Sequence, residues 1–253
     1  MDLGLRGLNA LVTGASRGIG FAIAEHLALE GVNVSICGRT QDQLDIAVKQ
    51  LRTHGTTIHS EVLDTADHDA VKTWTDNSAK EFGGIDIVIS NVSGMIVSGE
   101  AGWRQNFEID LLGYVGLVEA ALPYLELSKA GSIVALGSTA AVETFGDPAG
   151  PYGAFKAAMI QHTSGLAQNL APKGIRCNTI SPGPVFFEGG SWERVKTGNP
   201  AFYEKTLAHI ARGSFGTAEE VARVVTFVAS PAASYLTGEN IVVDGGFTKK
   251  VKF

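Results

Sequence analysis

The chain has 253 residues, a length that one large domain can fill. Hydrophobic residues make up 45% of it and charged residues 18%, which excludes an intrinsically disordered chain. Its 20 basic and 26 acidic residues give a formal net charge of -6, so we expect no binding of nucleic acid through the phosphate backbone.

Short apolar runs alternate with longer amphipathic ones along the chain, a pattern typical of strands and helices in turn. The expected strands are 8–13, 32–37, 57–63, 85–90, 132–136, 175–180 and 240–243. The expected helices are 19–29, 41–54, 66–82, 103–127, 152–170 and 218–229. Strands separated by helices pair in parallel through right-handed crossovers. The sequence therefore predicts one α/β domain over residues 1–253, a doubly wound, seven-stranded parallel sheet with helices on both faces.

The first expected strand ends in a glycine-rich motif, Thr13–Gly20, and a helix follows at once. Glycines there let the backbone turn tightly and approach a pyrophosphate, whose charge is stabilised at a helix N-terminus. The residues expected to hold a dinucleotide are Gly14, Ser16, Arg17, Gly18, Ile19 and Gly20. The alternative is a tight turn in which the glycines serve packing alone.

The second expected strand indicates which dinucleotide is bound. In NAD-binding folds an acidic residue about 20 positions beyond the glycines holds the ribose 2'-hydroxyl. Here Gly38 and Arg39 stand at that point, and the nearest acid, Asp42, falls within the next helix. Arg39 and Arg17 can both bind a 2'-phosphate, so the sequence predicts NADP(H). The alternative is that both arginines are exposed charges without a ligand.

The two cysteines, Cys37 and Cys177, lie in apolar runs and predict neither a disulfide framework nor a metal site. The six histidines show no ligand spacing, so we expect no metal. This cysteine usage is typical of a cytoplasmic protein. No apolar run approaches the roughly 18 residues that span a membrane, and the first run is too short for a signal peptide, so we expect no membrane association.

A tyrosine, a lysine and a serine form a candidate catalytic group. Tyr152 and Lys156 lie four residues apart at the start of an expected helix, which places them on one helix face. A lysine cation held close to a tyrosine favours the phenolate and makes the hydroxyl a usable acid and base near neutral pH. Ser138 follows the strand 132–136, where its hydroxyl can donate to a carbonyl oxygen.

With these residues the chain resembles the classical short-chain dehydrogenase/reductase family over essentially its whole length. The matching positions are Thr13–Gly20, Asp64, Asn91, Ser138, Tyr152, Lys156, Ser181–Gly183, Tyr235–Gly238 and Val243–Gly246. The resemblance implies a Rossmann-like fold and reversible hydride transfer between a nicotinamide and an alcohol or carbonyl group. It implies that Tyr152 is the general acid in reduction, that Lys156 binds the nicotinamide ribose and that Ser138 orients the carbonyl. It further implies that Asp64 meets the adenine.

The chain departs from the family pattern at three places. The loop Ser90–Ser93 is bulkier than the family's Asn-Asn-Ala-Gly; Asn91 is still expected to contact the cofactor and Ser93 the substrate. Phe187 stands where a threonine often contacts the carboxamide, so Pro182, Gly183 and the backbone near Val185 are expected to hold the nicotinamide.

The third departure is Asp110, which stands where the family places an asparagine of the proton relay. Its carboxylate is expected near Lys156, where it would offset part of the ammonium's effect and displace the pH optimum of alcohol oxidation upward. The alternative is an Asp110 side chain that points elsewhere or bridges to a neighbouring subunit.

The segment Pro182–Gly216 interrupts the alternation of strands and helices, and we expect an irregular insertion at about 184–216. It carries the aromatic residues Phe186, Phe187, Trp192, Phe202 and Tyr203. They can form a local core or a lid over the substrate. The lid is favoured because the segment leaves the carboxyl end of a strand, where ligands bind in such sheets. Phe186, Phe187 and Trp192 are therefore candidate substrate contacts.

The sequence thus predicts an NADPH-dependent carbonyl reductase, or the same enzyme working as an alcohol dehydrogenase, on an apolar or moderately polar ketone. A 3-oxoacyl group on an acyl carrier protein is one candidate; the acidic net charge argues against it, although Lys129 and Lys173 can form a basic patch. The rival hypothesis is a non-catalytic NADP(H) sensor or structural subunit. By resemblance, helices 103–127 and 152–170 form the core of a homotetramer, or of a homodimer; in a monomer they would simply be well buried.

Overall fold

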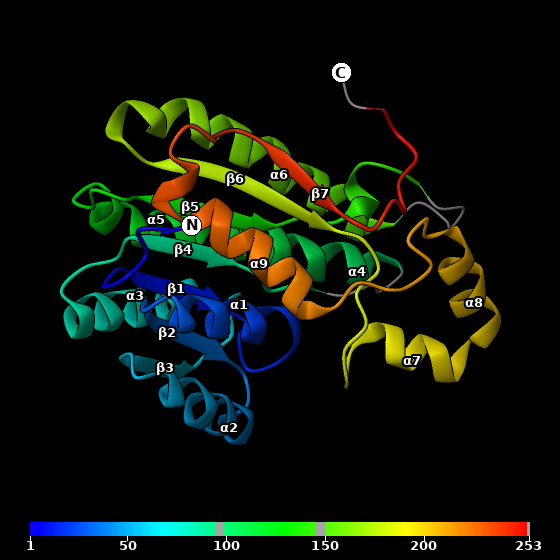
Figure 1. Ribbon diagram of the computed structural model, residues 1–253, viewed down its shortest axis with the longest axis horizontal. Helices are drawn as coiled ribbons and strands as arrows, with labels where there is room; N and C mark the ends of the chain where they lie inside the picture. The colour runs from blue at the N-terminus through cyan, green and yellow to red at the C-terminus, as the bar shows by residue number, and fades with distance from the viewer. Residues whose placement is uncertain (95–98, 145–149, 252–253) are drawn as a thin grey trace.

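The computed structural model describes residues 1–94, 99–144 and 150–251 (Figure 1). Its centre is a seven-stranded sheet in the order β3-β2-β1-β4-β5-β6-β7, in which every neighbouring pair is parallel. The strands are β1 (Asn9–Thr13), β2 (Asn33–Gly38), β3 (Ile58–Val62), β4 (Ile87–Ser90), β5 (Ser132–Leu136), β6 (Arg176–Pro182) and β7 (Asn240–Val243). The predicted strands are confirmed, with ends that differ by one or two residues.

Helices cover both faces of the sheet and enclose two separate cores. One core packs against α1 (Gly18–Leu29), α2 (Gln41–Leu51) and α9 (Ala218–Ala229). The other packs against α3 (His68–Phe82), α5 (Gly113–Leu125) and α6 (Pro151–Leu170). Successive residues of a strand serve opposite cores: Val12 belongs to the first and Leu11 to the second. This two-sided burial is why the strands are continuously apolar, and it confirms the doubly wound α/β prediction.

The expected helix 103–127 consists of three elements. They are α4 (Gly99–Asn106), a π-helical turn η2 (Phe107–Leu112) and α5. Insertions of this kind often occur at functional positions because they re-aim side chains. Here the π-turn carries Asp110, which is buried, so the break in helical regularity coincides with a buried charge.

The insertion 184–216 is not irregular, and that prediction is wrong. It contains α7 (Ser191–Gly198) and α8 (Pro200–His209), which lie beyond the carboxyl edge of the sheet (Figure 1). Pro200 opens α8, and the Asn199 side chain caps it by accepting from the Phe202 amide at 3.1 Å. Three of the five aromatic residues join a third small core, whereas Phe187 packs against the first core; the members of the third core are Phe186, Trp192, Tyr203, Leu207, Ile210, Phe215 and Phe247. The local-core alternative therefore describes their packing.

Four short 3-10 helices complete the chain: η1 (Arg52–His54), η3 (Thr139–Ala141), η4 (Ala171–Lys173) and η5 (Pro231–Ala233). Among the described residues, no helix is long and apolar enough to cross a membrane. Because all the strands run parallel, their carboxyl ends meet at one edge of the sheet. The residues singled out in the sequence gather at this edge.

Candidate active site

The glycine loop after β1 has a backbone that only glycine adopts easily. Gly14 and Gly18 have φ angles of 62° and 58°, in the left-handed region. A Cβ atom on Gly20 would lie 2.4 Å from the Gly14 carbonyl oxygen, so a side chain there would force the loop apart. Asn91, at the end of β4, donates from Nδ2 to the carbonyl oxygens of Thr13 and Gly14, both at 3.1 Å. Asn91 thus holds the loop in shape.

The N-terminus of α1, which this loop presents, has no side-chain cap. Its N-cap residue Arg17 makes no side-chain capping bond, and the first turn carries no acidic residue. By contrast α3 is capped by Asp67, and α9 begins with a capping box of Thr217 and Glu220. Free amides and the positive end of the helix dipole suit an anionic group. The loop and helix end therefore fit a dinucleotide pyrophosphate.

The side chains predicted to read the adenine end lie together beside the carboxyl end of β2. Arg39 follows β2, and its Nη1 is 4.0 Å from Oδ2 of Asp64, which follows β3. Ser16 lies close by, since its Oγ is 3.4 Å from the position of a Cβ on Gly38. The Arg39 side chain is 73% exposed, so its guanidinium is free to turn toward a phosphate.

Arg17, the second predicted phosphate reader, binds elsewhere in the structure. Its Nη1 donates at 2.8 Å to the carbonyl oxygen of Gly189, in the segment that leads from β6 to α7. Phe187, from the same segment, lies against Gly18. The sequence identified each of these residues separately but did not predict these contacts across the site.

The predicted Lys156 and Asp110 form a buried ion pair. Lys156 Nζ is 3.0 Å from Asp110 Oδ1, and each residue is only 1% exposed. The lysine also donates to the Leu136 carbonyl oxygen at 2.9 Å, and the Met159 sulfur lies 3.7 Å away. The second carboxylate oxygen of Asp110 accepts from the Gly94 amide at 2.9 Å. Asp110 therefore points toward the lysine, and the alternative in which it points elsewhere is excluded.

Tyr152 and Ser138 come from neighbouring segments. Lys156 Nζ lies 6.0 Å from the centre of the Tyr152 ring, on the same face of α6. Ser138 ends the stretch after β5 and caps η3 by accepting from the Ala140 amide at 3.1 Å. A Cβ on Gly153 would lie 2.6 Å from the Ala140 carbonyl oxygen, so the glycine lets the first turn of α6 lie directly against η3. Gly153 was not predicted from the sequence, although its position between Tyr152 and Lys156 was the available signal.

The remaining predicted contacts follow β4 and β6. Pro182 ends β6, and the Gly183 amide donates to the Val243 carbonyl oxygen at 2.9 Å. Val185 pairs with Gly216 in an isolated parallel bridge, which fixes the start of the insertion. Ser93 lies in the loop after β4, next to residues 95–98, which are outside the described part of the chain.

Two candidate substrate contacts belong to the aromatic core. Trp192 packs on Phe215 with ring centres 5.0 Å apart, and Phe186 packs on Tyr203 at 6.4 Å. Within the described residues, no group of three or more His, Cys, Asp or Glu side chains is arranged to hold a metal ion.

Comparisons with known proteins cover nearly the whole chain. The family described as enoyl-(acyl carrier protein) reductase matches residues 14–248. Isoepoxydon dehydrogenase of Penicillium expansum is 40% identical over 258 residues, with 100% of this chain and 99% of the relative covered. The 3-oxoacyl-(acyl-carrier-protein) reductase of Thermotoga maritima is 32% identical, with 96% and 98% covered. The solved structure of L-sorbose reductase from Gluconobacter frateurii, complexed with NADPH and L-sorbose, has a TM-score of 0.90 at 28% identity and covers 99% of this chain and 100% of its own.

Proposed function

The chain belongs to the short-chain dehydrogenase/reductase family, and from this premise we propose that it interconverts a small ketone and its alcohol with NADP(H). The observation that carries the proposal is one juxtaposition. Tyr152 and Lys156 lie on one face of α6, at the sheet edge where α1 presents an uncapped N-terminus. A tyrosine acid, a lysine cation and a pyrophosphate cradle at one edge suit hydride transfer coupled to proton transfer.

NADP(H) is the proposed cofactor, and its chemistry is to deliver a hydride to the carbonyl carbon or to take it back. Its pyrophosphate would lie against Gly14, Ser16, Gly18, Ile19 and Gly20, at the uncapped end of α1. Arg39 would bind the 2'-phosphate, with Arg17 as a second cation, and Asp64 would meet the adenine. The backbone from Pro182 to Val185 would hold the nicotinamide, while Asn91 supports the loop from behind. The NADPH complex of the L-sorbose reductase supports this assignment.

Tyr152 would supply the proton. In ketone reduction its hydroxyl would donate to the carbonyl oxygen, and in alcohol oxidation the phenolate would accept the hydroxyl proton. The Ser138 hydroxyl would donate a second hydrogen bond to the same oxygen and orient it. The Lys156 ammonium, on the same helix face, would stabilise the phenolate form.

Lys156 has three N–H donors, and three acceptors lie around its ammonium group in the structure. The Leu136 carbonyl oxygen and the Asp110 carboxylate are strong partners, whereas the Met159 sulfur is a weak acceptor. A ribose hydroxyl could replace the weak contact without breaking the strong ones. Asp110 is therefore proposed as a positioning residue that aims the lysine and lowers the net charge around it.

The substrate is proposed to be a small free ketone or alcohol. Isoepoxydon dehydrogenase and L-sorbose reductase are named for small molecules, whereas the Thermotoga maritima relative is named for a carrier-bound 3-oxoacyl group. The basic patch that Lys129 and Lys173 could form is poorly placed to bind a carrier protein near the active site. Lys129 precedes β5 and Lys173 precedes β6, so both lie at the amino edge of the sheet. Lys173 is also paired with Glu126 at 2.5 Å. A carrier held there would be at the opposite edge from Tyr152.

A homo-oligomer is proposed from the family and from one exposed aromatic group. Trp103 and Phe107 are 46% and 39% exposed, and both pack against Phe155 of α6, with ring centres 5.7 and 5.8 Å apart. Such a group can be buried by a second copy. Light scattering after gel filtration tests this: a monomer at micromolar concentration would overturn it.

The activity is tested by following reduced-nicotinamide absorbance with a panel of substrates. The panel contains isoepoxydon and L-sorbose as small molecules, and one 3-oxoacyl group both free and carrier-bound. We expect turnover with NADP(H), a fall of about 10²- to 10⁴-fold in Tyr152→Phe, and no advantage of the carrier-bound ketone over the free one. Binding of NADPH without turnover of any member would favour the sensor hypothesis. A large preference for the carrier-bound ketone would overturn the small-molecule assignment.

A further inference from the structure

The face of Gly18 that lacks a side chain is covered by Phe187. A Cβ atom on Gly18 would lie 2.6 Å from Cε2 of the phenyl ring and 2.7 Å from Cζ. In the common Gly-x-Gly-x-x-Gly loop the second glycine is bare so that the backbone can approach the pyrophosphate, and we assign the same use to Gly18 in this Gly-x3-Gly-x-Gly loop. Gly18 is the second glycine of the motif, so the ring of Phe187 fills the space that this glycine leaves open.

Three further contacts hold Phe187 in this place. Residues 187–190, which we call the strap, form a tight turn in which the Gly190 amide donates to the Phe187 carbonyl oxygen at 3.0 Å. The Gly189 amide donates to Glu193 Oε2 at 2.7 Å, which ties the strap to α7. Arg17 donates to the Gly189 carbonyl oxygen at 2.8 Å, which ties it to the glycine loop. The strap therefore bridges α7 and the glycine loop.

Arg17 has two competing uses in this arrangement. Its guanidinium can bond the neutral carbonyl of the strap or the 2'-phosphate of a cofactor. A hydrogen bond between two charged groups is roughly twice as strong as one with a neutral partner, so the phosphate is the stronger competitor. When the phosphate takes Arg17, the strap loses its link to the glycine loop.

We propose that the strap is a gate on the cofactor site: a closed strap and a bound dinucleotide exclude each other, and the 2'-phosphate opens the gate by drawing Arg17 away from Gly189. The inference rests on the proposed function and adds its regulation. The apparent affinity then equals the intrinsic affinity multiplied by the fraction of molecules whose gate is open. The gate would also favour NADPH over NADH, because only NADPH carries the group that competes for Arg17.

The test measures dinucleotide binding by calorimetry on the full chain, without any substrate. Phe187→Ala removes the ring from Gly18 and is expected to tighten both NADPH and NADH by about three- to tenfold, as expected when a gate that is mostly closed is opened. Phe202→Ala is the matched control, because the ring of Phe202 stacks on Trp192 and not on Gly18; its dissociation constants should equal those of the wild type. Phe187→Leu, which keeps an apolar side chain, replaces Phe187→Ala if that variant does not fold.

Kinetics and a second variant add independent measurements. The observed binding rate of the wild type should level off at high NADPH, because opening becomes limiting, and should rise linearly in Phe187→Ala. Arg17→Gln should bind NADH more tightly than the wild type, since it releases the strap, while its preference for NADPH falls.

The outcomes separate the gate from the proposed function. Unchanged or weaker NADPH binding in a folded Phe187 variant would overturn the gate alone, provided that the wild type binds NADPH. A wild type that binds neither dinucleotide would overturn both proposals.

Discussion

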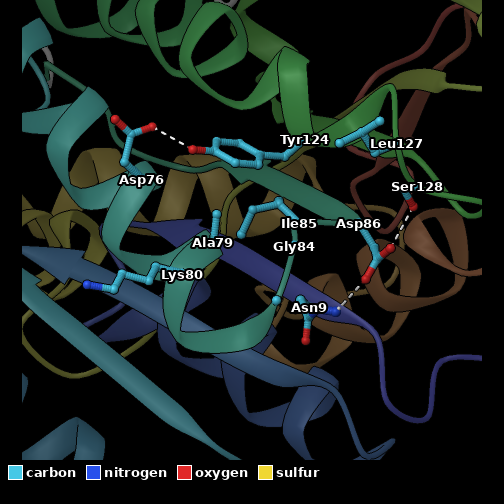
Figure 2. A pocket seen from close by; sticks show the side chains of 11 residues that line it. Asn9, Asp76, Ala79, Lys80, Gly84, Ile85, Asp86, Tyr124, Leu127 and Ser128 are labelled. Carbon is cyan, nitrogen blue, oxygen red and sulfur yellow. Dashed lines mark hydrogen bonds between the residues drawn. The ribbon is translucent and has the colours of Figure 1, made fainter.

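The two edges of the sheet carry the same kinds of polar side chains in different arrangements. The amino edge has an open pocket of about 510 Å³ (Figure 2). Tyr124 donates to Asp76 at 2.8 Å, and Ser128 donates to Asp86 at 2.6 Å. The second Asp86 oxygen accepts from the Asn9 amide at 2.9 Å. Both carboxylates in this pocket therefore have partners at both oxygens, since Lys72 binds the other oxygen of Asp76.

The carboxyl edge places a tyrosine and an aspartate, Tyr152 and Asp110, beside the buried charge of Lys156. Asp110 and Lys156 are enclosed in the protein, where bringing two ions out of water costs several kcal/mol each and their attraction only partly offsets it. Such a pair is poor evidence for stability. Polar residues are therefore not by themselves a sign of function: at the amino edge they bond to each other near water, and at the carboxyl edge they carry a burial cost that activity would explain.

The sharpest test of this comparison replaces one tyrosine at each edge. Tyr152→Phe removes the proposed proton donor, and turnover is expected to fall by about 10²- to 10⁴-fold, the usual contribution of a general acid. Tyr124→Phe loses its bond to Asp76 but should leave turnover unchanged. Steady-state ketone reduction measures both. Equal losses in the two variants would remove the distinction between the edges.

The next largest effect concerns the aspartates. Asp110→Ala leaves Lys156 buried without its counterion and is expected to cost about 3–5 kcal/mol of unfolding free energy, measured by urea titration. Asp110→Asn keeps the shape and should lower the midpoint of the pH profile for alcohol oxidation, because the full effect of the ammonium then reaches Tyr152. Asp86→Asn, at the amino edge, is the control and should leave that profile unchanged. Coincident profiles for Asp110→Asn and the wild type would contradict the positioning role.

Reversing one charge at each edge tests cofactor choice. Arg39→Asp removes a charge-assisted hydrogen bond worth about 1.5–3 kcal/mol and adds repulsion, so NADPH efficiency should fall roughly ten- to a hundredfold relative to NADH. Lys80→Asp changes the charge of the amino-edge pocket by the same amount and should leave the ratio unaltered. The ratio of kcat/KM for the two cofactors is the measurement. An unchanged ratio in Arg39→Asp would show that another residue reads the phosphate.

The smallest effect is a pH dependence of stability at the amino edge. The hydrogen bond from Lys72 holds the pKa of Asp76 below its ordinary value of 3.8; burial opposes this shift, and the bond from Tyr124 adds to it. A lowered folded pKa means that the stabilisation is complete above the unfolded pKa and is lost as the pH falls through the folded one. Asp76→Asn should therefore be destabilising at pH 6 and much less so at pH 2.5 in urea titrations. A destabilisation by Asp76→Asn that is equal at pH 6 and pH 2.5 would contradict the inference that it is the ionised form of Asp76 that stabilises the fold.

The local pattern of the sequence was enough to predict the elements and the chemistry of the site. Alternating apolar runs predicted all seven strands, because a strand buried on both faces must be apolar along its whole length. The glycine motif predicted the loop, since Gly14 and Gly18 adopt positive φ angles that other residues rarely take. The i, i+4 spacing predicted that Tyr152 and Lys156 share a helix face, because helical periodicity alone decides that.

Some local signals were present but too weak to predict structure. The helices α7 and α8 are short, and the glycines and aromatic residues around them hid their periodicity, so the segment was expected to be irregular. The π-turn within 103–127 was also not predicted, because the whole stretch was expected to be one continuous helix.

The contacts across the site were decided by the tertiary structure alone. The sheet order 3-2-1-4-5-6-7 brings Arg39 beside Asp64, and the return of the chain after β6 brings Phe187 onto Gly18. The burial of Asp110 against Lys156 likewise requires η2 and α6 to pack together. Periodicity reports which side of an element is buried, but not which distant residue meets it there. That choice depends on strand order and packing, and so the sequence by itself determined the elements and the chemical groups, while the fold decided their partners.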